Sequence, residues 1–383
     1  MPKIPYTKRS DGRYYKQIVI GTDPITGKRK VKTLYDKDWR SLDKKVREFM
    51  LDIDAGRYVI TDVTFGECVE LWWKIKENCA SSTKYLYKRR LKKLLPLYSI
   101  KLNDLKPQTI TFLLDNYKSE KKYAPFQLHA LISDILNFAE SKHLIGRNII
   151  KEVDKPKIKP PQPKKLTAEE KNAIEQFIAN SKNLKDLEIK TMLAILYYTG
   201  IRRGELLSLK RENIDFDNNR IHVKNTICIS EEGRTIEKET TKTKAGVRVI
   251  PIIPQLKAIL EEYVSNRKLD DNRRLLFENK RTKNILSYSN FEYRWKKIKK
   301  RINEYLPSGE NTNITAHYLR HNYATELVYS GIPLKTVQTI MGHEKIQTTL
   351  DIYTNTLVDE DDFVDKLTQR MMSVKNQSDI TLN

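Results

Sequence analysis

The sequence predicts a multidomain α+β protein, and three observations support this. Near the N-terminus two β-prone runs flank a turn, and a helical pattern follows them. Between residues 63 and 155 the apolar residues recur at helical spacing. Residues 166–372 combine helical patterns with several short β-prone runs. We therefore expect a small β-sheet with a helix, then an all-helical domain, then a mainly helical domain with a small antiparallel sheet.

Residues 1–60 make up the first expected domain. The runs RYYKQIVIG and RKVKTLYD flank the turn DPITGK, which predicts a hairpin, and the helical stretch SLDKKVREFMLDIDAG ends at Gly56. This segment carries 15 Lys and Arg against 8 Asp and Glu. A sheet this basic either lies in a DNA groove or is a solvated surface hairpin.

Residues 63–155 make up the second expected domain. Thr64 is a plausible N-cap for the first helix. In the next helix, SSTKYLYKRRLKKLLPLY, the basic residues lie mostly outside and are interleaved with tyrosines in the sequence. This suits either contact with DNA phosphates or an ordinary amphipathic helix. Two more helices are expected near 106–118 and 125–142. The expected core positions of the first two helices are Phe65, Cys68, Leu71, Trp72, Ile75, Leu86, Leu91 and Leu94.

The stretch KPKIKPPQPKK at residues 155–165 is expected to be an extended basic linker, because it holds four prolines. Thr167 and Glu170 then form a predicted capping box that opens the third domain, residues 166–372. Helices are expected at 167–180, 186–198 and 203–209, and strands at RIHVKNTICI, RTIEKETT and VRVIPII. Residues 373–383 are expected to be a C-terminal tail.

The charge of the chain favours a polyanionic partner. There are 71 Lys and Arg against 49 Asp and Glu, a formal charge of +22, which attracts nucleic acid and gains from counterion release. Charge alone would also fit a solubilising surface or an RNA-associated protein. The three cysteines have no metal or redox spacing, and we expect them to be reduced. No signal peptide or long apolar run is evident, so we expect no membrane partner and a cytoplasmic protein.

Four short clusters carry side chains suited to cutting a DNA strand without losing its bond energy. Such a reaction needs a nucleophile that can hold the phosphate, cations for its oxygens, and an acid for the leaving 5′ oxygen. Tyrosine, arginine, and lysine or histidine suit these roles in turn. The clusters are YYTGIRRGELLSL with Arg202, ETTKTKAGVRVIPI with Lys242, TAHYLRHNYAT with His317 and Arg320, and MGHEKIQTTLDIYTN with His343 and Tyr353.

The local patterns predict where these side chains lie. Arg202 should project from a helix N-terminus, and Lys242 should lie near the tip of a hairpin. His317 and Arg320 are three residues apart, which places them on one helical face. Gly342 and the polar stretch after it predict a turn and then a helix that carries Tyr353.

In order and spacing, the four clusters resemble the boxes of the tyrosine recombinases, and more narrowly the integrases of conjugative transposons and temperate phages. TGIRRGE resembles the first arginine box, TKTKAGVRVIPI the lysine hairpin, HYLRHNYAT the His-x-x-Arg box, and MGHEKIQTTLDIYTN the Gly-His and tyrosine box. The resemblance extends to a helical core-binding domain at 63–155 and a basic arm-binding domain at 1–60.

The resemblance implies a site-specific recombinase that cleaves and rejoins DNA through a 3′-phosphotyrosine. Arg202 and Arg320 would hold the scissile phosphate, His317 and His343 would hydrogen-bond it and help to move protons, Lys242 would protonate the 5′ oxygen, and Tyr353 would be the nucleophile. The family uses no metal and no nucleotide cofactor. The implied partners are double-stranded DNA at core and arm sites, further copies of the chain in a tetramer on DNA, an excisionase and a host DNA-bending protein.

Several alternatives remain open from the residues alone. Lys238 and Lys244 lie close enough to Lys242 to compete for the acid role. His317 and His321 are spaced to bind zinc, although no further ligand is near in the sequence. A type IB topoisomerase would use similar chemistry, and a non-catalytic DNA-binding regulator would share the charge. The sequence gives no attachment site and does not separate a phage from a conjugative element.

Overall fold

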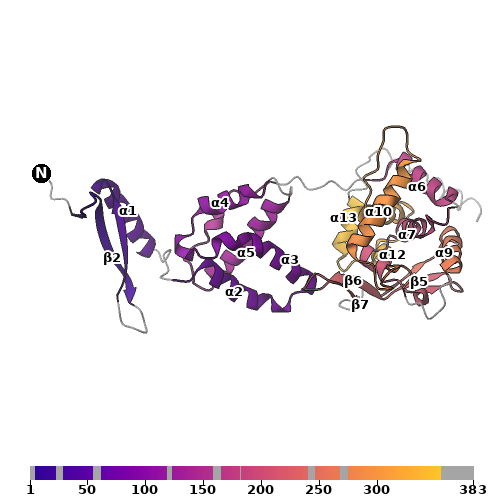
Figure 1. The fold of residues 1–383 in the computed structure, drawn as a ribbon, viewed down its shortest axis with the longest axis horizontal. Helices are drawn as coiled ribbons and strands as arrows, with labels where there is room; N and C mark the ends of the chain where they lie inside the picture. The colour runs from indigo at the N-terminus through magenta and orange to yellow at the C-terminus, as the bar shows by residue number, and fades with distance from the viewer. Residues whose placement is uncertain are drawn as a thin grey trace, which may run out of the picture. The chain divides into compact units, whose positions relative to one another are not determined.

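A computed structural model describes residues 5–22, 29–54, 62–118, 123–157, 165–181, 183–239, 246–267 and 275–354. The chain divides into two compact units, Met1–Pro160 and Pro161–Asn383 (Figure 1). The first holds a small sheet with one helix and a separate helical core, and the second mixes helices with two small antiparallel sheets. The expected α+β class is confirmed. The boundaries near residue 60 and at 155–165 stay predictions.

The N-terminal sheet is antiparallel, with strand order β1-β2-β3, and it confirms the expected hairpin. Residues 23–28 of its turn lie outside the described residues, as does Gly56. Because side chains alternate across a strand, Ile18 is buried while Val19 and its cross-strand partner Val31 are exposed. The elements are β1 (Thr7–Lys8), β2 (Tyr14–Thr22), β3 (Arg29–Asp36) and α1 (Trp39–Asp54).

The helical part of the first unit opens at Thr64, which is the N-cap that the sequence predicted, and Glu67 completes a capping box with it. Thr64 Oγ1 accepts from the Glu67 amide at 3.2 Å, and Glu67 Oε2 accepts from the Thr64 amide at 2.7 Å. The elements are α2 (Phe65–Ile75), η1 (Lys76–Asn78), α3 (Ser81–Leu91), η2 (Lys92–Leu97), η3 (Leu102–Asp104), α4 (Pro107–Asn116), α5 (Ala124–Ser141) and η4 (Ile149–Glu152).

Three of the expected core positions here are wrong. Leu71, Ile75 and Leu86 are 41%, 57% and 45% exposed, whereas Phe65, Cys68, Trp72, Leu91 and Leu94 are buried as expected. Helix α2 buries only a narrow stripe against the rest of this core, so Leu71 falls beside the stripe and Ile75 at its end. In α3 the inward position is taken by Tyr87, whose ring meets Trp72 edge to face at 5.2 Å, and this turns Leu86 outward.

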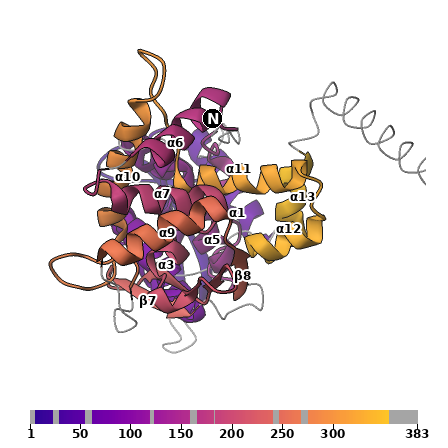
Figure 2. The same ribbon diagram turned by 90° about the vertical axis from the view of Figure 1, so that its right-hand side faces the viewer.

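The second unit is built around α7, which is buried along almost its whole length. It packs against α6, α9, α10 and α11, and Figure 2 shows these helices gathered in one body. The capping box of Thr167 and Glu170 is confirmed at the start of α6. The helices are α6 (Ala168–Asn180), α7 (Leu187–Thr199), α8 (Arg203–Leu207), η5 (Arg211–Asn213), α9 (Pro254–Arg267), α10 (Tyr288–Asn303), α11 (Ala316–Tyr329), α12 (Leu334–Met341) and α13 (Ile346–Thr354).

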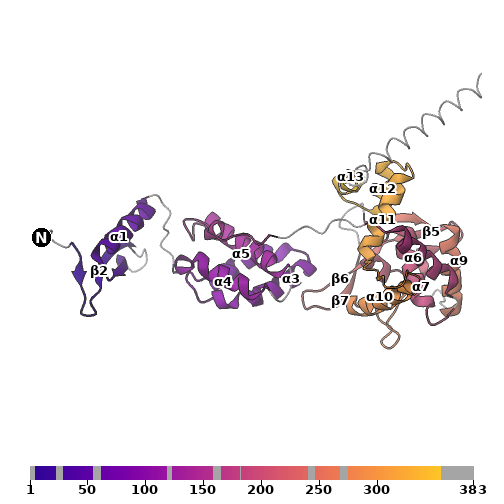
Figure 3. The same ribbon diagram turned by 90° about the horizontal axis from the view of Figure 1, so that it is seen from above.

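The described strands of this unit form two sheets, and none of them pairs as the hairpin expected around Lys242, a residue that lies outside the described ranges. Strand β7 pairs with β6, and β8 pairs with β5, so the described strands that precede and follow Lys242 belong to different sheets. The pairing of β8 with β5 places Ile250 opposite Ile221 in the core. Figure 3 shows β6 and β7 extending away from the helices. The strands are β4 (Ile214–Asp215), β5 (Arg220–Val223), β6 (Asn225–Ile229), β7 (Thr235–Glu239) and β8 (Arg248–Pro251).

Two glycines end helices next to the expected site residues. Gly200 follows α7 with φ 59°, and a Cβ there would lie 2.5 Å from the Tyr323 ring. Gly342 follows α12 with φ 64° and turns the chain toward α13, which packs on α11 and α12 (Figure 2). The helix that carries Tyr353 is therefore confirmed. Among the described residues, none of the helices has the length and apolar character needed to cross a bilayer.

Candidate active site

Arg202 lies between the glycine that ends α7 and the first turn of α8. Its amide and its Nη1 both donate to the Glu205 carboxylate at 2.9 Å, and its Nη2 donates to the Gly342 carbonyl at 2.6 Å. Its side chain is 41% exposed, so part of the guanidinium faces solvent. Arg202 is the N-cap residue of α8, which confirms its expected place at a helix N-terminus, although α8 ends at Leu207, two residues earlier than expected. Glu205 in the first turn of α8 holds the guanidinium in place.

Three arginines meet at the C-terminal end of α12. The last carbonyls of a helix lack partners within it, and cations are favoured there. The carbonyls of Ile340, Met341 and Gly342 each accept from a different guanidinium. The donors are Arg248 Nε at 2.7 Å to Ile340, Arg320 Nη2 to Met341, and Arg202 Nη2 to Gly342.

Arg320 is the most enclosed of the expected phosphate ligands. It is buried on α11, and its Nη1 donates to the Gly200 carbonyl at 2.8 Å. Burial and the nearby Arg202 lower the pKa of Arg320 to about 9, which leaves its guanidinium charged at neutral pH. The first arginine box and the His-x-x-Arg box are thus joined through the end of α7.

Glu205 balances this positive cluster. Its carboxylate is buried and takes both Nη atoms of Arg248, at 2.9 and 2.7 Å, as well as Arg202. Burial by itself would raise the pKa of Glu205, but the hydrogen bonds and charges of Arg248 and Arg202 outweigh burial and hold that pKa below its ordinary value. Glu205 therefore supports the arginine box, as its sequence position suggested.

The sequence reading missed Arg248. A signal was present, because Arg248 alternates with Val249 in a strand whose Ile250 points inward, and an inward arginine needs a carboxylate. Nothing in the local pattern identified that carboxylate as Glu205, 43 positions earlier.

The histidines of α11 form a contacting pair. Thr315 caps this helix by accepting from the Tyr318 amide at 3.1 Å, and one turn on the Nε2 atoms of His317 and His321 lie 3.1 Å apart. Burial, then the charges of Arg320 and Arg202, lower the pKa of His317; burial, then His317, lower that of His321. Within the described ranges no group of three His, Cys, Asp or Glu side chains gathers to bind a metal, and the neighbouring guanidinium groups repel a cation.

His343 follows the glycine that ends α12 and is buried. Its Nδ1 lies 3.0 Å from Thr349 Oγ1 on α13, and its backbone is held by Gln338. Burial, followed by the charges of Arg320 and Arg202, lowers the pKa of His343 to about 4. His343 is therefore a neutral imidazole at physiological pH, tied to the helix that carries Tyr353.

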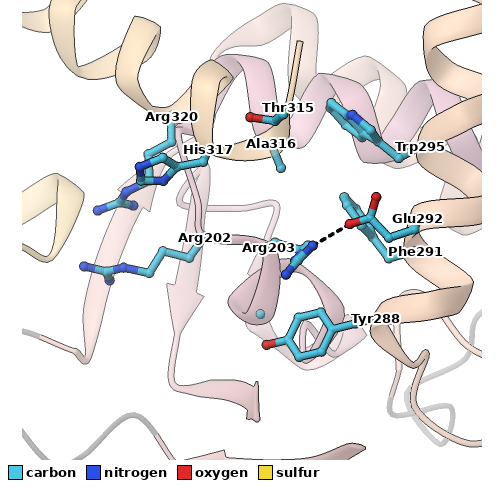
Figure 4. Close-up of a pocket in the computed structure, with 11 residues that line it drawn as sticks. Arg202, Arg203, Tyr288, Phe291, Glu292, Trp295, Thr315, Ala316, His317 and Arg320 are labelled. Carbon is cyan, nitrogen blue, oxygen red and sulfur yellow. Dashed lines mark hydrogen bonds and ion pairs between the residues drawn. The ribbon is translucent and has the colours of Figure 1, made fainter. Parts of the chain in front are cut away.

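A cavity of about 520 Å³ opens beside these residues. In Figure 4 the side chains of Arg202, His317 and Arg320 project toward the same side of this pocket, so three of the six expected residues lie together. Arg203 instead stacks on Tyr288, 4.3 Å from the ring centroid, and donates to Glu292 at 2.6 Å. Arg203 is thus held by the opposite wall.

Of the remaining two expected residues, Tyr353 is partly described and Lys242 is not described. The backbone of Tyr353 belongs to α13, which packs on α11 and α12, but its side chain lies outside the described part of the chain. Lys242 lies outside it entirely. The described side chains suit an anion site, because three guanidinium groups meet the single Glu205 carboxylate, and His317 and His343 are placed to accept protons beside it.

The chain is similar to several known proteins. The model of the phage integrase family matches residues 164–360. A tyrosine recombinase XerC-like protein of Caldanaerobacter subterraneus subsp. tengcongensis is 28% identical over 385 residues, covering 93% of this chain and 95% of that protein. The fold is similar to that of the Tn1549 transposon integrase bound to circular intermediate DNA, with a TM-score of 0.64, 20% identity, and coverage of 79% of this chain and 100% of that one. It is also similar to a lambda integrase tetramer on a Holliday junction, with a TM-score of 0.54, 20% identity, and coverage of 92% and 95%.

Proposed function

The chain belongs to the phage integrase family and is a site-specific DNA recombinase, and we propose that it works through Tyr353, with Arg202 and Arg320 as its phosphate clamp. The term phosphate clamp is used below for these two arginines. The nucleophile would attack the scissile phosphate while the clamp neutralises its non-bridging oxygens.

One observation carries this proposal. Arg202 and Arg320 hydrogen-bond to consecutive carbonyls at the end of α12, and α13 with Tyr353 begins only a few residues later. The anion site and the helix of the nucleophile are therefore parts of one hydrogen-bonded structure. A carbonyl oxygen that accepts from a guanidinium also marks where a phosphate oxygen could be bound.

The chemistry follows from the described charges. The Tyr353 oxygen would form a bond to phosphorus as the bond from phosphorus to the 5′ oxygen breaks, leaving a 3′-phosphotyrosine. The neutral imidazoles of His317 and His343 suit hydrogen bonding to the phosphate and acceptance of the tyrosine proton. We assign Lys242 to protonate the 5′ oxygen. A 5′ hydroxyl of a second strand would then attack the phosphotyrosine and restore the tyrosine.

The proposed partners are supported by similar proteins of known structure. The two solved structures described above contain DNA, and one of them is a tetramer on a Holliday junction. We propose that this chain also binds double-stranded DNA and assembles as a tetramer on it, with residues 1–60 on arm sites and residues 63–155 with 166–372 on the core site. An excisionase and a host DNA-bending protein complete the proposal, with the reaction in the cytoplasm.

The proposal is tested by trapping the covalent intermediate. The full chain is incubated with DNA of the element that encodes it, the protein-linked fragments are recovered under denaturing conditions, and their ends are sequenced. We expect protein on 3′ ends at one position per strand. Adducts on 5′ ends, or no adducts on any element end, would overturn the proposed chemistry. Relaxation of plasmids that lack these positions would instead support a topoisomerase.

A further inference from the structure

We propose that Arg248 is a positioning residue for the phosphate clamp, because it holds Glu205 and the end of α12 so that Arg202 presents its charge to the DNA. This inference rests on the proposed function. It adds a residue from β8 that contacts neither the DNA nor the nucleophile in the mechanism above.

All three nitrogen atoms of the Arg248 guanidinium donate hydrogen bonds within the protein. Its side chain and that of Glu205 are each 2% exposed. Its two Nη atoms donate one to each carboxylate oxygen of Glu205, and its Nε donates to the Ile340 carbonyl. Arginine can make these three bonds at once because its donors form a rigid planar fork, whereas the lysine ammonium is a point charge that cannot span them.

The charges explain why this matters for Arg202. The Glu205 carboxylate lies between two guanidinium groups and is shared by them. If Arg248 were neutral, the buried carboxylate would pair with Arg202 alone, and an ion pair of that kind would hold and neutralise the guanidinium that should meet the phosphate. With Arg248 present, three guanidinium groups face one carboxylate, and the excess positive charge remains for the DNA.

Arg248 is also linked to the phosphate clamp through the carbonyls at the end of α12. Arg248, Arg320 and Arg202 bind the consecutive carbonyls of residues 340–342. A shift of the Ile340 carbonyl would therefore move the carbonyls that the two clamp arginines bind. Arg248 acts on the clamp through both Glu205 and this short segment.

The test compares two DNA substrates. Wild type and the Arg248→Gln variant of the full chain are given saturating core-site duplex, and single-turnover adduct formation is timed. The second substrate carries a methylphosphonate at the scissile position, where a methyl group replaces one charged oxygen. We expect the variant to be roughly 10- to 100-fold slower on the phosphodiester, by analogy with the loss of a residue that orients a metal ligand through hydrogen bonds. On the methylphosphonate the two proteins should differ by only a few-fold, because less charge needs a clamp.

Controls separate positioning from folding. Arg267 is a matched control. Like Arg248, it donates to a carboxylate, that of Glu278, and to a backbone carbonyl, that of Leu276. None of these three residues is one of the expected site residues. Arg267→Gln should leave the rate ratio between the two substrates at the wild-type value. Arg202→Ala should shift the ratio in the same direction as Arg248→Gln. If Arg248→Gln does not fold, Arg248→Lys keeps the buried charge and carries the same comparison.

The outcomes are distinct. No slowing by Arg248→Gln, or equal slowing on both substrates, would overturn the positioning role. If the wild type itself forms no adduct with either substrate, the proposed function fails first.

Discussion

The Nη2 atom of Arg202 donates to the carbonyl oxygen of Gly342 at 2.6 Å, across 140 positions of the chain. The first arginine box is thus tied directly to the segment that leads into the helix of Tyr353. An arriving phosphate would compete with this carbonyl for the same guanidinium. We therefore expect phosphate binding at Arg202 to be coupled to the position of α13.

The Tyr353→Phe variant should bind DNA like the wild type and never become covalently attached. The change removes one hydroxyl and leaves the phosphate clamp in place. Adducts are counted on a nicked duplex that traps the intermediate, with binding followed by gel shift. Any adduct formed by this variant would place the nucleophile at another residue.

The Arg202→Ala variant should lower strand cleavage by roughly 10²–10³-fold, the usual effect of losing one preorganised charge donor. Binding to the core site should weaken far less, because many other cations contact the backbone. Single-turnover cleavage and gel shift measure the two effects on the same duplex. Cleavage at the wild-type rate would exclude Arg202 from the clamp.

The Arg320→Ala variant should match that loss of cleavage and also be less stable than Arg202→Ala. Arg320 is 5% exposed, and its removal leaves the carbonyls of Gly200 and Met341 without this donor. A buried polar group without a partner costs about 1–3 kcal/mol. Urea unfolding of both variants gives the comparison, and equal midpoints would contradict the buried role of Arg320.

The Lys242→Ala variant should be inactive on ordinary DNA and be rescued by a substrate with sulfur at the 5′ bridging position. A thiolate leaves without needing a proton, so the acid becomes dispensable. Lys238→Ala and Lys244→Ala are tested beside it, because both are near in the sequence. Rescue of Lys244→Ala in place of Lys242→Ala would move the acid by two positions.

The His343→Gln variant should make stability less dependent on pH between about 6.5 and 4. The pKa of His343 is lowered to about 4 in the folded protein, so in this window the unfolded chain binds more protons than the folded one. The wild type therefore loses stability as pH falls through the window, and full stability is present above it. Urea midpoints of both proteins at pH 7 and pH 5 measure the difference. The pKa values of His317 and His321 are lowered too, and both residues remain in the variant, so some pH dependence should persist. If the wild type and the variant show the same change of stability with pH, His343 is not responsible for it.

Deletion of residues 1–60 should leave cleavage of short core-site duplexes intact and abolish integration between full attachment sites. The excess of basic residues in this segment and its exposed sheet face suit a second DNA site. Tethering two sites through one chain raises the effective concentration at the core. Normal integration by the truncated protein would reduce the segment to a basic appendage.

The sequence by itself determined the features that depend on near neighbours. The capping boxes of Thr64 with Glu67 and Thr167 with Glu170 use residues three positions apart, and the N-terminal hairpin is set by alternation and a turn. The helix after Gly342 that carries Tyr353 was also predictable, because the glycine and the polar stretch are local signals. The four boxes carry the resemblance to the family in the sequence alone, because each box is a short local pattern.

Tertiary structure decided what depends on distant parts of the chain. Leu71 and Leu86 follow helical periodicity, yet only packing against the rest of the core determines which face is buried, and Tyr87 takes the inward position. Strand β8 pairs with β5 and not with β7. The local sequence allows either pairing, but only the pairing with β5 buries Ile250 opposite Ile221. Arg248 and Glu205 became partners only through that pairing, since a buried carboxylate binds whichever guanidinium the fold brings within hydrogen-bond distance.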